Sequence, residues 1–209
     1  MTVQTKGKIG VIIEEHFDET EYQRFNEFFP KHGYEVEHIS NLWGQEKLTF
    51  KGNDHTAEVT VTVDISNVEP ADYKGILLIG GYAMDRLRYQ VNPKPGQPNQ
   101  SPAVEFLRKA VKAMDTDNLK IGTICHSIWL FCADPTLIKG RKVTCAHNII
   151  CDVENAGGIV IYEGDRTPDV YIDGNLISSQ HPGVVDEFMQ AFLEEIENTK
   201  QLTIPAVVG

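Results

Sequence analysis

The chain has 209 residues, of which 41% are hydrophobic, enough for a buried core and typical of a globular protein. Its 19 basic and 30 acidic residues give a formal net charge of -11, which argues against a nucleic acid or an anionic membrane surface as the main partner. No segment approaches the roughly 20 apolar residues of a membrane span, and the start of the chain lacks the apolar stretch of a secretory signal. We therefore expect a cytoplasmic protein whose partners are small molecules or other proteins.

The first 63 residues predict a strand, a helix and a strand, followed by an added hairpin. The β-branched run at residues 8–13 is typical of a strand buried on both faces. Residues 20–33 carry aromatic side chains at helical spacing before Gly33, which suits a C-terminal cap, and residues 34–39 predict a second strand. Alternating polar and apolar residues at about 46–63 predict a β-hairpin inserted before the next unit.

The middle of the chain predicts two more buried strands, separated by a loop and a helix. Residues 73–81 form an apolar run that ends in two glycines, and the proline-rich polar segment at about 91–102 predicts a surface loop. Ser101 can cap the following helix, which has Pro102 in its first turn. The run "LKIGTIC" is the next predicted strand, and "HSIWLFCAD" predicts a helix that begins directly after it.

The last third of the sequence predicts short elements, one hairpin and a closing helix. "RKVTC" and "GIVIYE" predict strands on either side of a short helix, and "DVYIDGNLISS" has the Asp-Gly-Asn turn of a hairpin. Residues 184–197 have the pattern of an amphipathic helix. There is no internal repeat and no long linker, so we predict one α/β domain over residues 1–209, with a mostly parallel sheet and helices on both faces.

Cys125 stands where a buried strand meets the predicted helix. Functional groups gather at the carboxyl ends of parallel strands, and a turn this tight is the geometry of a nucleophile elbow. Free backbone N–H groups and the helix dipole at such a turn would lower the pKa of the thiol and could receive an oxyanion. A buried inert thiol is an equally good interpretation of these residues alone. The adjacent His126 is either a general base for the thiol or a solvated residue of the first helical turn.

The remaining thiols and histidines give no strong indication of a disulfide or a metal site. No two of the four cysteines have C-x-x-C spacing, so we expect reduced thiols at Cys125, Cys132, Cys145 and Cys151. Metal ligation by Cys125 together with histidines is a weak hypothesis, because no ligand-spaced cluster is present. The histidines considered for it are His126, His147 and His181. We predict no metal and no other cofactor.

Six segments follow one another in a recognisable order: "FDETEY", "IGGYAMDRLR", "TICHSIWLFCAD", "LIKGRKVTC", "DVENAGG" and "ISSQHPG". In this order the chain resembles the ThiJ/PfpI superfamily, and the PfpI-type intracellular peptidases most closely. The resemblance extends over nearly the whole chain. It implies a flavodoxin-like three-layer sandwich, no cofactor, and a homo-oligomer, either a dimer or a hexamer, with a shared active site.

The resemblance also implies roles for four side chains. Cys125 would be the nucleophile, and Glu21 would place a protonated carboxyl group beside it. The alternative for Glu21 is an ordinary acidic residue in the first turn of a helix. Asp85 of a neighbouring subunit would pair with His126 and complete a triad, whereas Asp85 taken alone would be a solvated charge beside nearby arginines.

Oxyanion-binding and pocket positions follow from the same resemblance. Gly81 and the backbone N–H of His126 would be the oxyanion donors, with Ser127 beside them in the binding region. Ser127 stands where many relatives have glycine, which would alter access to the elbow. His181, in "SSQHPG", would be either a pocket residue or a structural one. The inserted hairpin and the proline-rich loop would reshape the pocket or the subunit contact.

These assignments predict a cysteine-nucleophile hydrolase or lyase that acts on a carbonyl group. Its substrate would be a peptide or amide, as for a PfpI-type peptidase, or a small carbonyl compound, as for a glyoxalase or deglycase. A second hypothesis is a redox-sensing stress or chaperone-like protein in which Cys125 is oxidised. A third is a catalytically silent relative that keeps only the fold.

Overall fold

A seven-stranded sheet forms the centre of the molecule in the computed structural model, which describes residues 5–202 and their side chains through residue 198. Residues 1–4 and 203–209 of the predicted domain lie outside the described residues. Neighbouring strands are parallel, except that β10 runs antiparallel to β11 at one edge. From edge to edge the strands are β10 (Val170–Asp173), β11 (Leu176–Ser179), β7 (Lys120–Ile124), β6 (Gly75–Leu78), β1 (Lys8–Ile12), β2 (Glu35–Ser40) and β5 (Val63–Asp64).

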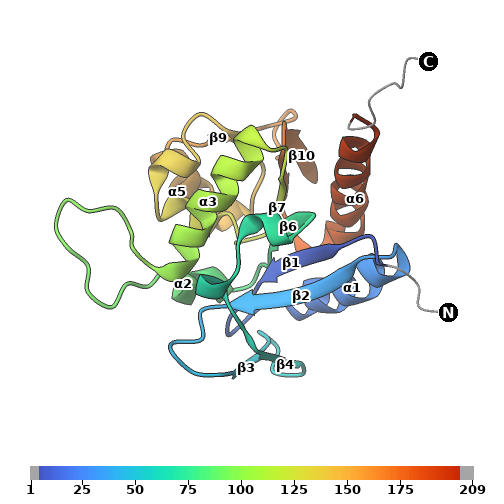
Figure 1. The fold of residues 1–209 in the computed structure, drawn as a ribbon. Helices are drawn as coiled ribbons and strands as arrows, with labels where there is room; N and C mark the ends of the chain where they lie inside the picture. Colours follow the sequence, from blue (N-terminus) through green and yellow to red (C-terminus); the bar gives the residue numbers. More distant parts are fainter. Residues whose placement is uncertain (1–4, 203–209) are drawn as a thin grey trace, which may run out of the picture.

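Helices cover both faces of this sheet, which confirms the predicted three-layer α/β sandwich. Figure 1 shows α1 and α6 on one side of the strands and α3 and α5 on the other. The strand order is the flavodoxin-like one, in which β1 lies between β2 and β6, with the two-residue β5 added at the edge beside β2. The α-helices are α1 (Glu19–Lys31), α2 (Ala83–Leu87), α3 (Pro102–Thr116), α4 (Trp129–Cys132), α5 (Ile150–Asn155) and α6 (Val185–Leu202). Short 3-10 helices lie at Ile65–Asn67, Pro70–Asp72, Pro135–Leu137, His147–Ile149 and Pro182–Val184.

The core forms where aromatic rings of α1 and α6 meet the central strands. The ring centroids of Phe25 and Phe188 are 6.3 Å apart, and those of Phe29 and Phe192 are 6.1 Å apart. A glycine in β7 makes room for these rings, because a Cβ at Gly122 would lie 2.8 Å from the Phe188 ring. All residues of β6 and β7 are buried, as expected for strands covered on both faces.

The added hairpin is present at the predicted position. Strands β3 (Leu48–Lys51) and β4 (Glu58–Val61) pair antiparallel and form a two-stranded sheet of their own. The predicted loop at 91–102 has no regular structure up to Ser101, whose hydroxyl accepts the Val104 N–H at 3.4 Å and caps α3. The predicted hairpin of β10 and β11 is also confirmed.

Two predicted elements are much shorter than the sequence suggested. The helix expected directly after Cys125 is instead a series of turns, and α4 begins only at Trp129. Its turns are closed by i to i+3 bonds, such as Trp129 N–H to His126 O at 3.0 Å. The strands expected at "RKVTC" and "GIVIYE" are the two-residue pair β8 (Lys142–Val143) and β9 (Ile159–Val160), which lies outside the main sheet. Within residues 5–202, no helix has the length and apolarity needed to cross a bilayer.

Candidate active site

A cleft of about 450 Å³ opens at the carboxyl edge of the sheet, around Cys125. Its walls come from the ends of β1, β6, β7 and β11, from the hairpin turn and from the segment before α5. Most of the lining side chains can donate or accept hydrogen bonds. The lining residues are Asp18, Asn53, Gly81, Tyr82, Cys125, His126, Ala146, His147, Asn148, Gln180, His181 and Pro182.

Cys125 occupies a strained turn directly after β7. Its φ is 59°, in the left-handed region that a residue with a Cβ adopts at a cost of roughly 1 kcal/mol or more. The backbone is held there from both sides, because its N–H donates to Ser179 O at 3.0 Å and its carbonyl accepts the Ala146 N–H at 3.2 Å. The residue is 8% exposed and lines the cleft. The predicted elbow geometry is therefore present, although no helix starts at the cysteine.

The expected lowering of the thiol pKa is not found. Burial raises the pKa of Cys125 to about 12, the charge of Glu21 adds to this effect, and the backbone N–H groups of Gly81 and His126 oppose it. The helix dipole cannot help, because α4 has only four residues and begins at Trp129. A reactive thiolate at Cys125 consequently needs a proton acceptor nearby and an uncharged Glu21.

Glu21 supplies the uncharged carboxyl group. It is fully buried, and this burial, followed by the charge of Asp18, raises its pKa well above the usual range. Oε2 accepts the Gly80 N–H at 2.6 Å, while Oε1 has no hydrogen-bond partner among the described residues. A Cβ at Gly80 would lie 2.7 Å from Oε1 and 2.8 Å from the Cβ of Cys125, so the carboxyl group and the cysteine approach the same glycine. A protonated Glu21 does not repel a thiolate and can donate a hydrogen bond.

Gly81 is required by the backbone at this point. Its φ is 73°, and a Cβ would lie 2.3 Å from the carbonyl oxygen of His16. Its N–H and that of His126 both act on the sulfur of Cys125, since each lowers the pKa of the thiol. The two predicted oxyanion donors therefore both lie close to the sulfur of Cys125.

The His126 ring lies between the thiol and a polar partner on another segment. Its Nδ1 is 3.4 Å from Sγ of Cys125, and its Nε2 is 2.9 Å from Oδ1 of Asn148. The ring also stacks on Tyr82, with centroids 5.6 Å apart and an interplanar angle of 21°. These contacts favour the general-base interpretation of His126 over that of a solvated residue.

Two predicted site residues lie away from this arrangement. Asp85 is 64% exposed, its carboxylate is 3.9 Å from the guanidinium of Arg88, and it lines a separate hollow with Trp43 and Tyr89. Within one chain it therefore does not meet His126. Ser127 is fully buried and is absent from the cleft wall, because its hydroxyl accepts the Ile124 N–H at 2.7 Å beneath the elbow.

His181 lines the cleft and also has a structural bond. Its Nδ1 accepts the Gly183 N–H at 2.9 Å, which leaves Nε2 as the protonated nitrogen of the neutral ring. Asp18 caps α1 by accepting the Glu21 N–H at 3.0 Å and faces the same cleft. No group of three histidine, cysteine or acidic side chains in the described part of the chain is placed to hold a metal ion.

Several cleft residues escaped the sequence analysis. Asn148 and Asn53 belong to no recognised motif and reach the cleft only through the fold, and Gln180 lies within "ISSQHPG" but was assigned no role. The one available signal was the position of Gln180, which directly follows the predicted hairpin strand "LISS" and so ends at the same sheet edge as Cys125. The position of Asn53 could not be predicted, because the sequence pattern of the hairpin does not indicate which part of the molecule its turn contacts.

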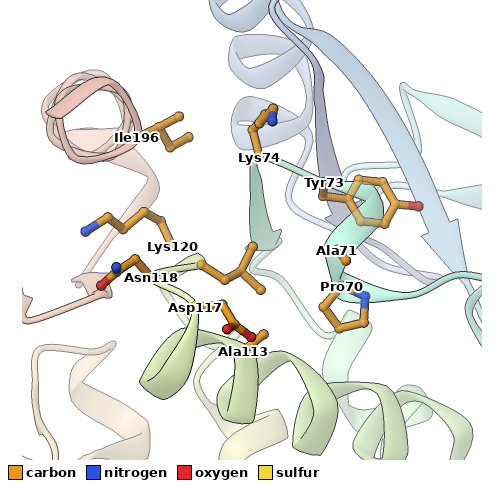
Figure 2. A pocket seen from close by; sticks show the side chains of 10 residues that line it. Pro70, Ala71, Tyr73, Lys74, Ala113, Asp117, Asn118, Lys120 and Ile196 are labelled. Atoms are coloured by element: carbon orange, nitrogen blue, oxygen red, sulfur yellow. The ribbon is translucent and has the colours of Figure 1, made fainter. Parts of the chain in front are cut away.

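A second hollow of about 380 Å³ lies at the opposite, amino edge of the sheet (Figure 2). Lys120 projects from the start of β7 into this view, and Tyr73 and Lys74 come from the segment before β6. The amino group of Lys120 already bonds Asn175 Oδ1 at 2.5 Å and Glu195 Oε2 at 3.2 Å. No cysteine or histidine lines this hollow.

The sequence is similar to a known protein family and to a bacterial stress protein. Residues 7–195 match the sequence profile of the DJ-1/PfpI family. The chain is 30% identical over 190 residues to general stress protein 18 of Bacillus subtilis, covering 91% of this chain and 98% of that protein.

Solved structures show the same fold. Schizosaccharomyces pombe DJ-1 superposes with a TM-score of 0.69 at 18% identity, over 95% of this chain and 100% of that one. A protein of Anabaena variabilis with DJ-1/ThiJ/PfpI-like and ferritin-like domains gives a TM-score of 0.76 at 22% identity. That match covers 92% of this chain and 48% of the two-domain protein, so the chain spans about half its length.

Proposed function

We propose that this chain, which belongs to the DJ-1/PfpI family, is an enzyme that uses Cys125 as a nucleophile on a carbonyl substrate. The observation that carries the proposal is the strained position of Cys125, whose sulfur lies 3.4 Å from an imidazole nitrogen at the edge of an open cleft. A merely structural thiol needs neither the strain nor the histidine.

The residues of the cleft have complementary parts in such a reaction. His126 takes the thiol proton, and the sulfur forms a bond to the carbonyl carbon while the C=O π electrons move to oxygen. The N–H groups of Gly81 and His126 then face the developing oxyanion. Glu21, neutral beside the sulfur, can give a proton to the oxyanion and take one back.

Two substrate classes fit this step. With a peptide or amide, the C–N bond breaks, the amine leaves with the proton held by His126, and water hydrolyses the thioester. With a 2-oxoaldehyde, the first adduct is a hemithioacetal, and a proton moves between neighbouring carbons before water releases a hydroxy acid. The cleft volume of about 450 Å³ accommodates a small molecule or the end of a peptide, and we keep both classes in the proposal.

A substrate panel tests the proposal. Peptide amides and 2-oxoaldehydes are incubated with the wild type, Cys125→Ala and Cys125→Ser, with Cys151→Ala as a matched control because Cys151 is exposed and lies outside the cleft. We expect turnover on one class by the wild type and Cys151→Ala, and a loss of at least about 10³-fold in both Cys125 variants. Full activity in the Cys125 variants would overturn the proposal.

A homo-oligomer, dimer or hexamer, is part of the proposed function. Three exposed apolar side chains surround the segment that contains Asp85: Tyr82 is 57%, Tyr89 60% and Val91 68% exposed. Exposed apolar patches on a globular protein are typical of interaction sites. A second copy docked on this segment would place its own Asp85 near the neighbouring cleft.

Reduced thiols and the absence of a membrane-crossing helix among the described residues fit a cytoplasmic setting.

A stress-response role is the alternative, and the name of the Bacillus subtilis relative favours it. In that role a peroxide would oxidise the Cys125 thiolate to a sulfenic and then a sulfinic acid, with the peroxide reduced to water. The raised thiol pKa and the low exposure of Cys125 weaken this alternative. Mass spectrometry after mild peroxide treatment tests it: oxidation confined to Cys125 would support a sensor, and oxidation spread over all four cysteines would count against one.

A further inference from the structure

The geometry points to Asn148 as the residue that positions His126 for proton transfer from Cys125, within a single chain. This inference rests on the proposed use of Cys125 as a nucleophile. It names a residue of the same chain as the third member of the site, in place of the partner subunit's Asp85 that the family resemblance implies. The contact that carries it is the 2.9 Å hydrogen bond between Nε2 of His126 and Oδ1 of Asn148.

With the amide oxygen of Asn148 facing the ring, the bond determines which nitrogen of His126 carries the proton. An amide oxygen can only accept, so Nε2 of His126 must donate and therefore carries the proton. In the neutral ring, Nδ1 is then the bare nitrogen, and Nδ1 is the atom that lies 3.4 Å from Sγ of Cys125. His126 is thus set as a proton acceptor for the thiol. If the amide NH₂ faced the ring instead, the proton would lie on Nδ1 and His126 could not act as the base.

Asn148 is tied to the elbow by the backbone. The Ala146 N–H donates to the carbonyl of Cys125 at 3.2 Å, and the Ile149 N–H donates to Ala146 O at 3.1 Å, which forms the 3-10 turn that presents Asn148. Tyr82 restrains the face of the imidazole, because its ring stacks on the His126 ring. The orientation of the imidazole is therefore restrained by both its edge and its face.

This arrangement makes a second subunit unnecessary for orienting His126. Asp85 of the same chain lies in a separate hollow, and an Asp85 from a second copy would find Nε2 already bonded to Asn148. The Asn148 amide stays uncharged, so it orients the ring without the strong stabilisation of imidazolium that a carboxylate would give. Cys125, His126 and Asn148 form the same kind of trio as a cysteine, histidine and asparagine in other cysteine enzymes.

Nitrogen NMR on the full chain labelled with ¹⁵N-histidine tests the tautomer directly. We expect neutral His126 in the wild type to carry its proton on Nε2. Asn148→Ala should give a mixture of tautomers, while Asn148→Asp should keep the proton on Nε2, because a carboxylate oxygen also accepts a hydrogen bond. The matched control is Asn155→Ala, an exposed asparagine whose amide contacts Cys151 rather than His126, and it should match the wild type. Asp85→Asn should also leave the tautomer unchanged.

Alkylation of Cys125 supplies a second readout that needs no substrate. Iodoacetamide forms the S–C bond as iodide leaves, and the thiol proton passes to His126. Followed by mass spectrometry of the Cys125 peptide from pH 6 to 10, the rate at neutral pH should fall about tenfold in Asn148→Ala and recover to within about threefold of the wild type in Asn148→Asp.

Three results would overturn the inference: a proton on Nδ1 in the wild type, an unchanged tautomer and alkylation profile in Asn148→Ala, or a tautomer that responds to Asp85→Asn but not to Asn148→Ala. Failure of the proposed function is separate. It would appear as turnover that survives Cys125→Ala, whatever the tautomer of His126.

Discussion

Glu21 places a carboxyl group where a charge is costly. Its side chain is fully buried, one oxygen accepts the Gly80 N–H, and the other has no partner among the described residues. The unfolded chain ionises the same group near its ordinary pKa. Folding therefore retains a proton that the unfolded chain releases, and this proton becomes a measurable property of the fold.

The sign of the pH dependence follows from this raised pKa. A carboxyl group whose pKa is higher in the folded state makes its full contribution to the stability of the protein at a pH below its unfolded pKa. That contribution is lost as the pH rises toward the pKa of the folded state. The loss is about 1.4 kcal/mol for each pH unit between the two values. We expect the free energy of unfolding of the wild type to fall between pH 5 and 8 relative to that of Glu21→Gln, which cannot ionise.

Urea unfolding at pH 5, 6, 7 and 8 measures this difference. Glu46→Gln is the control, because Glu46 is an exposed carboxylate in a loop and should follow the wild type. Parallel curves for the wild type and Glu21→Gln would show that the fold does not hold Glu21 neutral.

A buried acid, Glu19, helps to hold the hairpin of β3 and β4 at the candidate-site edge, together with backbone bonds of Lys51 and Asn53. Both oxygens of Glu19, at the start of α1, bind Thr56 in the hairpin turn, one through the Thr56 N–H at 2.9 Å and the other through its hydroxyl. In return the Glu19 N–H donates to Oδ1 of Asn53 at 3.3 Å, and Asn53 lines the cleft. The turn is therefore part of the cleft wall rather than a surface appendage.

Loss of this fastening should loosen the wall locally. We expect Thr56→Val to cost about 1 kcal/mol of stability and to speed amide hydrogen exchange over residues 52–57. Thr60→Val is the matched control, because it removes a hydroxyl contact with Thr49 on the same hairpin at 2.8 Å, away from the cleft. Equal exchange at 52–57 in the two variants would contradict the role given to Glu19.

Regular elements were largely predictable, because burial on two faces leaves a clear pattern in the sequence. The β-branched runs of β1 and β7 and the aromatic spacing of α1 are direct consequences of the core they fill. The failure came after Cys125, where an apolar run predicted a helix. There the Ser127 hydroxyl accepts a hydrogen bond from the Ile124 N–H, and the chain forms i to i+3 turns. The apolar side chains are therefore buried and the backbone is hydrogen-bonded without an α-helix.

The candidate site was predictable only where a motif marks it. Cys125, Glu21 and Gly81 lie within recognisable segments and do come together, with Cys125 and Gly81 in the cleft wall and Glu21 buried behind it. Asn148 is 22 positions away from His126 in the sequence, and their contact depends on the docking of a single 3-10 turn. No local pattern encodes such a contact, and the same holds for Asn53 in the hairpin turn.

The surface of the molecule combines a high negative charge with exposed apolar side chains, and the apolar side chains predict self-association. A chain with a formal net charge of -11 should repel its copies, yet Tyr82, Tyr89 and Val91 are exposed and close together in sequence. A second copy that covers these side chains would remove apolar area from water. We therefore expect self-association through this segment.

Light scattering on the purified chain at micromolar concentration tests this expectation. The double variant Tyr89→Glu with Val91→Glu should weaken the contact by roughly 2 kcal/mol or more and lower the measured mass to that of one chain. Tyr162→Glu is the control, since Tyr162 is 50% exposed and lies in the turn that follows β9. A wild type that is already monomeric, or a double variant of unchanged mass, would contradict the prediction.

The hairpin of β3 and β4 is a two-stranded sheet of its own that nevertheless contributes Asn53 to the cleft wall. Cys125 and His126 follow β7, and Glu21 lies in the first turn of α1. Asn53 comes instead from the hairpin, which is bonded to Glu19 and to the segment just before α1. In the proposed enzyme, the reacting groups and this part of the cleft wall would thus come from different stretches of chain. Exchanging residues 46–63 for another hairpin would change the wall at Asn53 and leave the turn at Cys125 in place, so this segment is a practical starting point for redesigning the cleft.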